Sequence, residues 1–303
     1  MKKAETMLSK TKFSRLFDLC NIIVLGFCML VAVLPFIHLA ALSLSSKPYV
    51  MANLVFFRPK GFHLENYDVI FRSRIFMQTL VNSVVRVIVG LTVNLLLVVL
   101  TAYPLSIGER RLRGRNAFLL YFFFTMLFNG GMIPTFLLVR DLNLINTLWA
   151  LILPGAVQVF SIIIMINYMR GIPGELYEAA VLDGAGHFKV LMQIFLPLSL
   201  PCIATLIVFS AVGHWNSWFD GMLYLKSPTK WPLQTYLQSI LADLQSLSQK
   251  IGMSAEEAQR YAQISDLSLI SAQMFISIVP ILLLYPFMQR YFISGIRLGS
   301  VKG

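Results

Sequence analysis

The sequence predicts an all-helical integral membrane protein with six transmembrane helices. Two observations support this prediction. Of the 303 residues, 57% are hydrophobic and only 13% are charged, whereas roughly a quarter of the residues are charged in an ordinary soluble domain. Several apolar stretches also exceed the roughly 20 residues that a helix needs to cross a bilayer with every backbone group paired.

Six apolar stretches reach this length. They lie at residues 19–46, 75–107, 116–139, 142–169, 190–219 and 267–289. Arg86, in the second, is the only Asp, Glu, Lys or Arg among them. A charge is costly in a hydrocarbon core, so we expect Arg86 to face the bundle interior or a wet cavity, although no carboxylate within the spans offers a partner. The first stretch exceeds the apolar core of a secretion signal, about 7 to 15 residues, and is predicted to be a retained membrane anchor.

Basic residues near the ends of the spans predict the orientation, because cytoplasmic loops carry the excess of Lys and Arg. The predicted inner segments hold Lys2, Lys3, Lys10, Lys12, Arg15, Arg110, Arg111, Arg113, Arg115, Arg170, Lys189, Arg290, Arg297 and Lys302. The predicted outer segments hold fewer, and the two longer ones can cross the membrane regardless of charge. We therefore expect both termini in the cytoplasm, with residues 1–15 and 291–303 as tails around a transmembrane domain at residues 16–290.

Composition and motifs exclude several function classes. The net charge of +11 could indicate nucleic acid, but the basic residues lie at membrane boundaries rather than along one face, so anionic lipid headgroups are the simpler partner. No phosphate-binding loop, zinc-protease motif or serine-hydrolase elbow occurs. The four His residues are too dispersed for a metal site, and the three Cys lie in apolar stretches as small hydrophobes. We expect neither catalysis nor a bound metal or cofactor in this chain.

The stretch ELYEAAVLDGAG, residues 175–186, stands out as charged between two apolar spans. Pro173 suits the first turn of a helix, and Glu175 and Glu178 lie where the helix dipole favours anions. Gly184 and Gly186 can take positive φ values and so end the helix in a sharp turn. An ordinary interhelical loop capped by glycines would have the same appearance.

The spacing of this stretch resembles the EAA signature of permease subunits in binding-protein-dependent ABC importers. The residues concerned are Glu178, Ala179, Ala180, Asp183, Gly184, Ile194, Leu196 and Pro197. The similarity extends to FNGGMIPTFLLVRDLNLINTLWALILPG at 128–155, to GHWNSWFDGMLYL at 213–225 and to the terminal GIRLGSVKG, and covers essentially the whole chain. Within the family, the chain is most similar to MalG-like carbohydrate permeases, particularly those for complex oligosaccharides such as oligogalacturonides and alginate fragments.

The resemblance implies the ABC importer permease (MetI-like) fold in a bacterial inner membrane, with this chain as half of a translocation pore. The loop at 172–189 would be the coupling element that docks on a cytoplasmic ATPase dimer, and that dimer would bind the ATP and Mg. A second permease subunit and an extracytoplasmic sugar-binding protein would complete the importer. The main alternative is a stand-alone secondary transporter or channel, which should carry acidic residues inside its spans; these spans have none.

Two groups of residues are candidates for contact with the substrate. Asn129, Gly130 and Gly131 interrupt the third span, as is tolerated where protein or a wet cavity satisfies the backbone, although a packing kink would leave the same pattern. The second group is an outer-gate candidate at the end of the fifth span, and consists of His214, Trp215, Asn216, Trp218 and Asp220. Its aromatic and polar groups suit a sugar, but Trp also marks membrane interfaces.

The outer segment at 220–266 is longer than a simple hairpin between the last two spans. Helical spacing relates Leu233, Leu237, Ile240, Leu241, Leu244 and Leu247. Farther on, Ser254 and Glu257 form a capping box. We predict two short outer helices, which either dock the binding protein or lie on the membrane.

Overall fold

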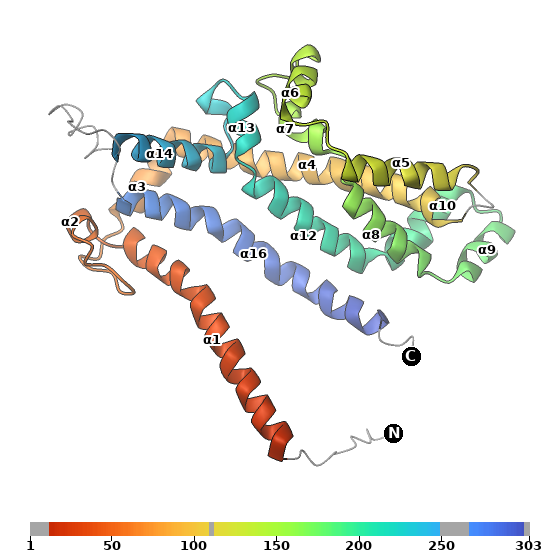
Figure 1. Cartoon of the computed structure of the whole chain (residues 1–303), viewed down its shortest axis with the longest axis horizontal. Coiled ribbons are helices and arrows are strands. Elements are labelled where there is room, and N and C mark those ends of the chain that lie inside the picture. Colours follow the sequence, from red (N-terminus) through yellow and green to blue (C-terminus); the bar gives the residue numbers. More distant parts are fainter. Residues whose placement is uncertain (1–11, 109–111, 249–266, 300–303) are drawn as a thin grey trace. The chain divides into compact units, whose positions relative to one another are not determined.

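A computed structural model describes residues 12–108, 112–248 and 267–299, and within these ranges every regular element is a helix (Figure 1). The chain divides into two compact units. One consists of Met1–Ile70 with Met253–Ile276, and the other of Phe71–Gly252 with Ser277–Gly303.

The first unit contains α1 (Lys12–Ser43), an apolar helix whose most hydrophobic stretch has no buried residue. A helix surface of this kind is expected to face lipid. After α1, the backbone N–H of Ser46 donates to the Lys60 carbonyl at 3.1 Å, and the Asn66 amide donates to the Ser43 carbonyl at 3.1 Å. These bonds hold the segment that contains α2 (Lys47–Met51) and the start of α3 (Glu65–Arg72) against the end of α1.

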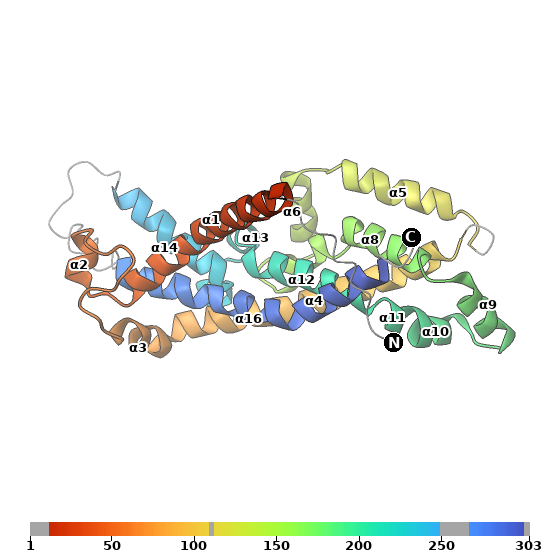
Figure 2. The ribbon, with the colours of Figure 1, turned by 90° about the horizontal axis from the view of Figure 1, so that it is seen from below.

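The central helix of the second unit is α4 (Arg74–Ser106), against which α8 (Val159–Arg170) and α12 (Leu200–Asn216) pack. Its buried positions recur every three or four residues, so α4 turns one continuous face inward. This face includes Phe76, Thr79, Ser83, Arg86, Gly90, Asn94, Val98 and Ala102. Figures 1 and 2 both place α9 (Gly174–Leu182) at one end of α4, and α13 (Phe219–Tyr224) with α14 (Leu233–Ser248) toward the other. We call these the α9 end and the α13 end.

Three of the described helices, α1, α4 and α16 (Leu267–Gly299), are long and apolar enough to cross a membrane, and the number rises to six if each bent pair of helices is one span. The bends are 110° between α5 (Arg115–Leu127) and α6 (Met132–Asp141), 53° between Trp149–Gly155 and α8, and 79° between His187–Leu198 and α12. Gly131 at the first bend has φ +92°, and Pro154 and Pro201 lie at the other two. These residues break helices, so the bends follow from the local sequence.

The predicted spans agree with the helices to different degrees. The second, 75–107, matches α4 within one residue at each end. The fourth was predicted to begin at residue 142, which is wrong: Asn143 and Asn146 have positive φ values, and the first helix there, α7 (Trp149–Ile152), begins later. A 3-10 turn, η1 (Leu153–Gly155), follows it. Helix α16 continues beyond the predicted end of the sixth span, residue 289, to Gly299.

Of the two helices predicted in the segment at 220–266, the first is present as α14, whose Leu233 and Leu237 are buried. It packs on α4, and its first backbone N–H donates to Ser83 Oγ at 2.7 Å. The predicted capping box of Ser254 and Glu257 lies outside the described residues, as do the basic residues of the tail before residue 12, Arg110 and Arg111, and Lys302.

Candidate functional site

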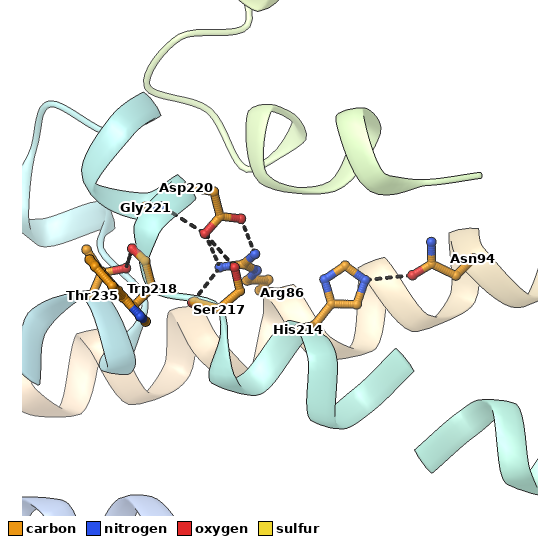
Figure 3. A network of polar contacts seen from close by, with 8 residues as sticks. All are labelled: Arg86, Asn94, His214, Ser217, Trp218, Asp220, Gly221 and Thr235. Carbon is orange, nitrogen blue, oxygen red and sulfur yellow. Dashed lines mark hydrogen bonds and ion pairs between the residues drawn. The ribbon is translucent and has the colours of Figure 1, made fainter. Parts of the chain in front are cut away.

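Arg86, the charged residue of the second span, pairs with Asp220 in the first turn of α13 (Figure 3). Its side chain is 2% exposed, and both terminal nitrogens of its guanidinium bond to the two carboxylate oxygens. Nη1 also donates to the Ser217 carbonyl at 3.1 Å. A two-pronged pair of this kind compensates a charge that would otherwise be very costly away from water.

The corner between α12 and α13 fixes the position of Asp220. Its Oδ1 accepts hydrogen bonds from Ser217 Oγ at 2.8 Å and from the Gly221 backbone N–H at 2.9 Å. Thr235 of α14 donates to the Trp218 carbonyl at 2.9 Å. Gly221 lies so close to this threonine that an added Cβ would come 3.0 Å from the Thr235 Cβ. The corner is therefore held by α4 on one side and by α14 on the other.

Asn94 lies farther along the same buried face of α4 and supports the break in the fourth span. Its side-chain amide donates to the carbonyls of Gly155, the last residue of η1, at 3.3 Å, and of Ala156, which follows it, at 2.8 Å. These carbonyls belong to a stretch where the helix is interrupted, so they need partners from elsewhere. The break is thus stabilised by the protein itself.

His214 joins this network from α12 (Figure 3). Its Nε2 lies 2.6 Å from Asn94 Oδ1, which also accepts from Ser210 Oγ at 2.9 Å. Because a carbonyl oxygen can only accept, Nε2 carries the proton and Nδ1 is left as an acceptor. The ring lies directly over Gly90, where an added Cβ would stand 2.6 Å from the imidazole Cε1. Glycine at this position therefore lets α12 approach α4.

Two cavities meet at Asp220 and Tyr224. The first, of about 370 Å³, lies beside the break in the fourth span, and its lining includes Arg86, Gln158, His214, Ser217, Asp220 and Tyr224. The second, of about 390 Å³, lies beside the break in the third span, and its lining includes Asn129, Gly131, Thr135, Phe219, Asp220 and Tyr224. Binding sites for small molecules typically have volumes of about 300 to 1,000 Å³. Each cavity is thus large enough to hold a small polar ligand.

Tyr224 presents an aromatic ring and a hydroxyl group at the boundary of the two cavities. Its ring stacks on Phe136, with 6.1 Å between centroids. Burial raises the pKa of the Tyr224 phenol, and the negative charge of Asp220 adds to the rise. The phenol is therefore protonated at neutral pH and can donate a hydrogen bond.

At the α9 end, the chain forms a short exposed helix with a closed C-terminus. Gly184 has φ +76°, its N–H donates to the Val181 carbonyl, and the Ala185 N–H donates to the Ala180 carbonyl. This pair of bonds is a Schellman motif. The predicted helix end at Gly184 is confirmed, whereas Gly186 has φ −74° and ψ 162°, an extended conformation, and not the positive φ considered for it.

Aromatic contacts connect this helix to α4. Tyr177 is buried, and its ring lies 6.3 Å from the ring of His187 in α10 (His187–Val190). His187 Nδ1 is 3.2 Å from the hydroxyl of Tyr103 on α4, whose ring packs edge-on against Phe195. Phe195 ends a π-helical turn, η2 (Leu191–Phe195), followed by α11 (Leu196–Leu198). The short helix thus has a direct side-chain connection to the second span.

Comparisons with known proteins identify the family. The chain is 39% identical over 295 residues to Protein LplC of Bacillus subtilis (strain 168), with 97% of each chain covered. It is 38% identical over 296 residues to the polygalacturonan/rhamnogalacturonan transport system permease protein YtcP of the same bacterium, covering 96% of this chain and 99% of the relative. The chain belongs to the permease subunits of carbohydrate ABC importers. No protein-family model matches it.

A solved structure agrees with this assignment. The structure of a bacterial ABC transporter involved in the import of the acidic polysaccharide alginate contains a chain that matches this permease with a TM-score of 0.82 and 32% identity, over 93% of this chain and 98% of that one. The family resemblance and the transport function inferred from the sequence are therefore confirmed. The permease is a transport subunit rather than an enzyme.

The structure brings part of the outer-gate candidate together. His214 and Asp220 share the first cavity, while Asn129 and Gly131 share the second with Asp220. Trp215 points elsewhere: it is buried, and its indole N–H donates to the Ser277 carbonyl at 3.0 Å. The remaining candidates, Gly130, Asn216 and Trp218, are exposed.

The EAA residues also divide into two groups. Glu178, Ala179, Asp183 and Gly184 are exposed on or just after α9, with Ala180 partly buried. Ile194 and Leu196 instead pack against the apolar core around α4 and α8, and Pro197 is exposed. The first group is therefore largely accessible at the surface, whereas Ile194 and Leu196 of the second group belong to the packing beneath it.

Sequence reasoning missed the partner of Arg86 because Asp220 lies just beyond the predicted fifth span. Asn94, Gln158 and Tyr224 were missed as well. One signal was available for Asn94: with Arg86 and Gly90 it forms a series with four-residue spacing on an otherwise apolar helix, which places all three on one face. In the part of the chain that the structure describes, no three His, Cys, Asp or Glu side chains gather as a metal-binding group.

Proposed function

We propose that the permease crosses the membrane six times, with three continuous and three bent spans, and that α9 faces the cytoplasm while the α13 end faces outward. The supporting observation is that α9 and α13 lie at opposite ends of α4, a 33-residue helix long enough to cross the bilayer. With six spans, both termini lie on the same side of the membrane as α9, which connects the fourth and fifth spans, and so in the cytoplasm.

Cysteine labelling tests this topology. In a variant without Cys20, Cys28 and Cys202, a cysteine at exposed Thr229 should react with a membrane-impermeant maleimide added to intact cells. A cysteine at exposed Glu175 in α9 should react only after the membrane is opened. The reverse pattern would reject the orientation.

The permease forms half of the translocation pore for an oligosaccharide, and a second permease subunit forms the other half. A cytoplasmic ATPase dimer, which binds ATP and Mg, docks on α9, and an extracytoplasmic binding protein delivers the sugar; no nucleic acid takes part. The observation that carries this proposal is the pair of polar cavities at two helix breaks in an otherwise apolar bundle, since interrupted helices inside a membrane protein line substrate paths.

The substrate is an oligosaccharide containing uronic acids. Support comes from the names of two similar proteins, one a transport system for polygalacturonan and rhamnogalacturonan and the other an importer of alginate. In proteoliposomes containing the complete importer and its binding protein, we expect ATP-dependent uptake of trigalacturonate. Uptake that proceeds without ATP, driven by an ion gradient, would contradict the proposal.

A further inference from the structure

The protein leaves several hydrogen-bonding groups of the two cavities unused. The Tyr224 hydroxyl has no hydrogen-bond partner among the described residues. Gln158 uses its Oε1 to accept from Ser161 at 3.1 Å, and its amide nitrogen has no such contact. Asn129 likewise uses its Oδ1 for the Gly131 N–H, at 2.8 Å, and leaves its nitrogen available.

These unused groups are a mixture of donors and acceptors without net charge. Tyr224, Gln158 and Asn129 can donate, and His214 Nδ1 can accept. The one ion pair in the first cavity, between Arg86 and Asp220, is compensated internally. Asp220, whose side chain is 23% exposed, would repel a carboxylate placed beside it. The cavities therefore match hydroxyl groups, which both donate and accept, better than they match an anion.

Both cavities are formed before any ligand arrives. Asn94 holds the break beside the first cavity through the carbonyls of Gly155 and Ala156. At the break beside the second, Thr135 Oγ1 donates to the Gly131 carbonyl at 2.8 Å. Since the protein itself bonds the carbonyls of Gly155, Ala156 and Gly131 at the two breaks, binding requires little ordering of these segments.

We propose that the two cavities are adjacent subsites for two consecutive rings of the transported oligosaccharide, which they hold through ring hydroxyls with Tyr224 and Asp220 between them. This inference rests on the proposed function and adds that this half of the pore itself contacts the sugar. Carboxylates of the sugar point away from Asp220.

The test uses the complete importer, trapped with ATP and vanadate after delivery of radiolabelled trigalacturonate by the binding protein. The label retained on the trapped complex measures sugar held by the permeases. Tyr224→Phe and Gln158→Leu should each lower retention by about three- to tenfold, the loss expected for one neutral hydrogen bond. The matched control is Tyr121→Phe, the same chemical change on a side chain of α5 that is 62% exposed and lies outside both cavities, and it should retain label like the wild type.

If Tyr224 and Gln158 had only a structural role, the two substitutions would lower the amount of folded complex and its ATP hydrolysis together with the retention of label. We expect the amount of folded complex, measured by co-purification with the ATPase, to stay at the wild-type level in both cavity variants. If the wild type transports trigalacturonate but retains no label, or if neither variant lowers retention, the subsites are wrong while the proposed function stands. If the wild type does not transport trigalacturonate with ATP, the proposed function fails and the subsites with it.

Discussion

The α13 end and the α9 end of the second unit are stabilised in opposite ways. At the α13 end, α4 meets α12 and α13 through a buried ion pair and side-chain hydrogen bonds, centred on Arg86 and Asn94. At the α9 end, α4 meets α8 and the segment from α10 to α12 through apolar and aromatic packing around Tyr103, Met165 and Phe195. Hydrogen bonds fix polar groups at set positions, which suits a ligand site. Packed side chains transmit displacement because they resist compression, which suits an element that is pushed by a partner.

The largest expected effect tests whether the α13 end depends on charge pairing. Asp220→Leu leaves Arg86 buried without a partner, and we expect a loss of about 3 to 5 kcal/mol in the free energy of unfolding. The double variant Arg86→Met/Asp220→Leu removes both charges and should recover most of this loss. The measurement is the thermal unfolding of the detergent-solubilised permease. Equal unfolding temperatures of the single and double variants would show that the ion pair does not stabilise the α13 end.

Two tryptophans near Asp220 should behave differently. Trp215 is 4% exposed and bonded to Ser277, so Trp215→Ala should cost about 3 to 5 kcal/mol, as for a large core side chain, and reduce the amount of assembled complex. Trp218 is 39% exposed, so Trp218→Ala should leave assembly intact and lower sugar uptake. Assembly is measured by co-purification with the ATPase. Unchanged uptake in Trp218→Ala would leave this residue only the role of a membrane-interface anchor.

At the α9 end, Gly184→Val should strain the backbone by about 1 to 3 kcal/mol, because φ is positive there. No atom lies within 4 Å of the added Cβ, so the strain comes from the backbone alone. We expect loss of ATP-driven uptake while the binding protein still binds sugar. Gly184→Asn is the control, since Asn tolerates positive φ, and it should retain most uptake.

Glu178→Lys should impair uptake in a similar way, because it reverses the charge of an exposed side chain on the surface of α9 that is proposed to dock on the ATPase. Only Glu175 lies in the first turn of α9, so the predicted effect of the helix dipole on Glu178 is wrong. Uptake and ATPase assembly are measured as for Gly184→Val. Normal uptake in both Gly184→Val and Glu178→Lys would reject α9 as the coupling element.

The smallest expected effect tests the aromatic connection at this end. Tyr103→Phe removes the hydrogen bond to His187 and keeps the ring packing, so the free energy of unfolding should fall by only about 0.5 to 1.5 kcal/mol. If this contact relays motion from α9 to α4, fewer sugar molecules should be imported per ATP hydrolysed. An unchanged ratio, with transport and hydrolysis measured on the same proteoliposomes, would confine the contact to a structural role.

The helices were predictable from sequence where the chain is apolar and continuous. The limits of α4 follow from hydrophobicity alone, and the helix end at Gly184 follows from the need for positive φ. The contacts between helices were not predictable in the same way. Nothing in the sequence shows that Asp220 reaches back to Arg86, because their pairing depends on the angle at which α12 turns into α13. The delayed start of the fourth span at Trp149 was missed because residues 142–148 contain four large apolar side chains, which suggest a continuing helix. The helix is excluded there by the positive φ values of Asn143 and Asn146, which the sequence does not show.

The π-helical turn at Leu191–Phe195 has a consequence for how this segment can change in evolution. An α-helix turns by about 100° per residue, and a π-turn holds one residue more than an α-helical turn. Removing one residue from this turn would therefore convert it into an α-helical turn and keep the orientation of α12, whereas adding one residue would rotate α12 by about that angle relative to α10. Ser210 and His214 would then turn away from Asn94, although no residue of the network had been replaced. The segment should therefore tolerate the loss of a residue better than the gain of one.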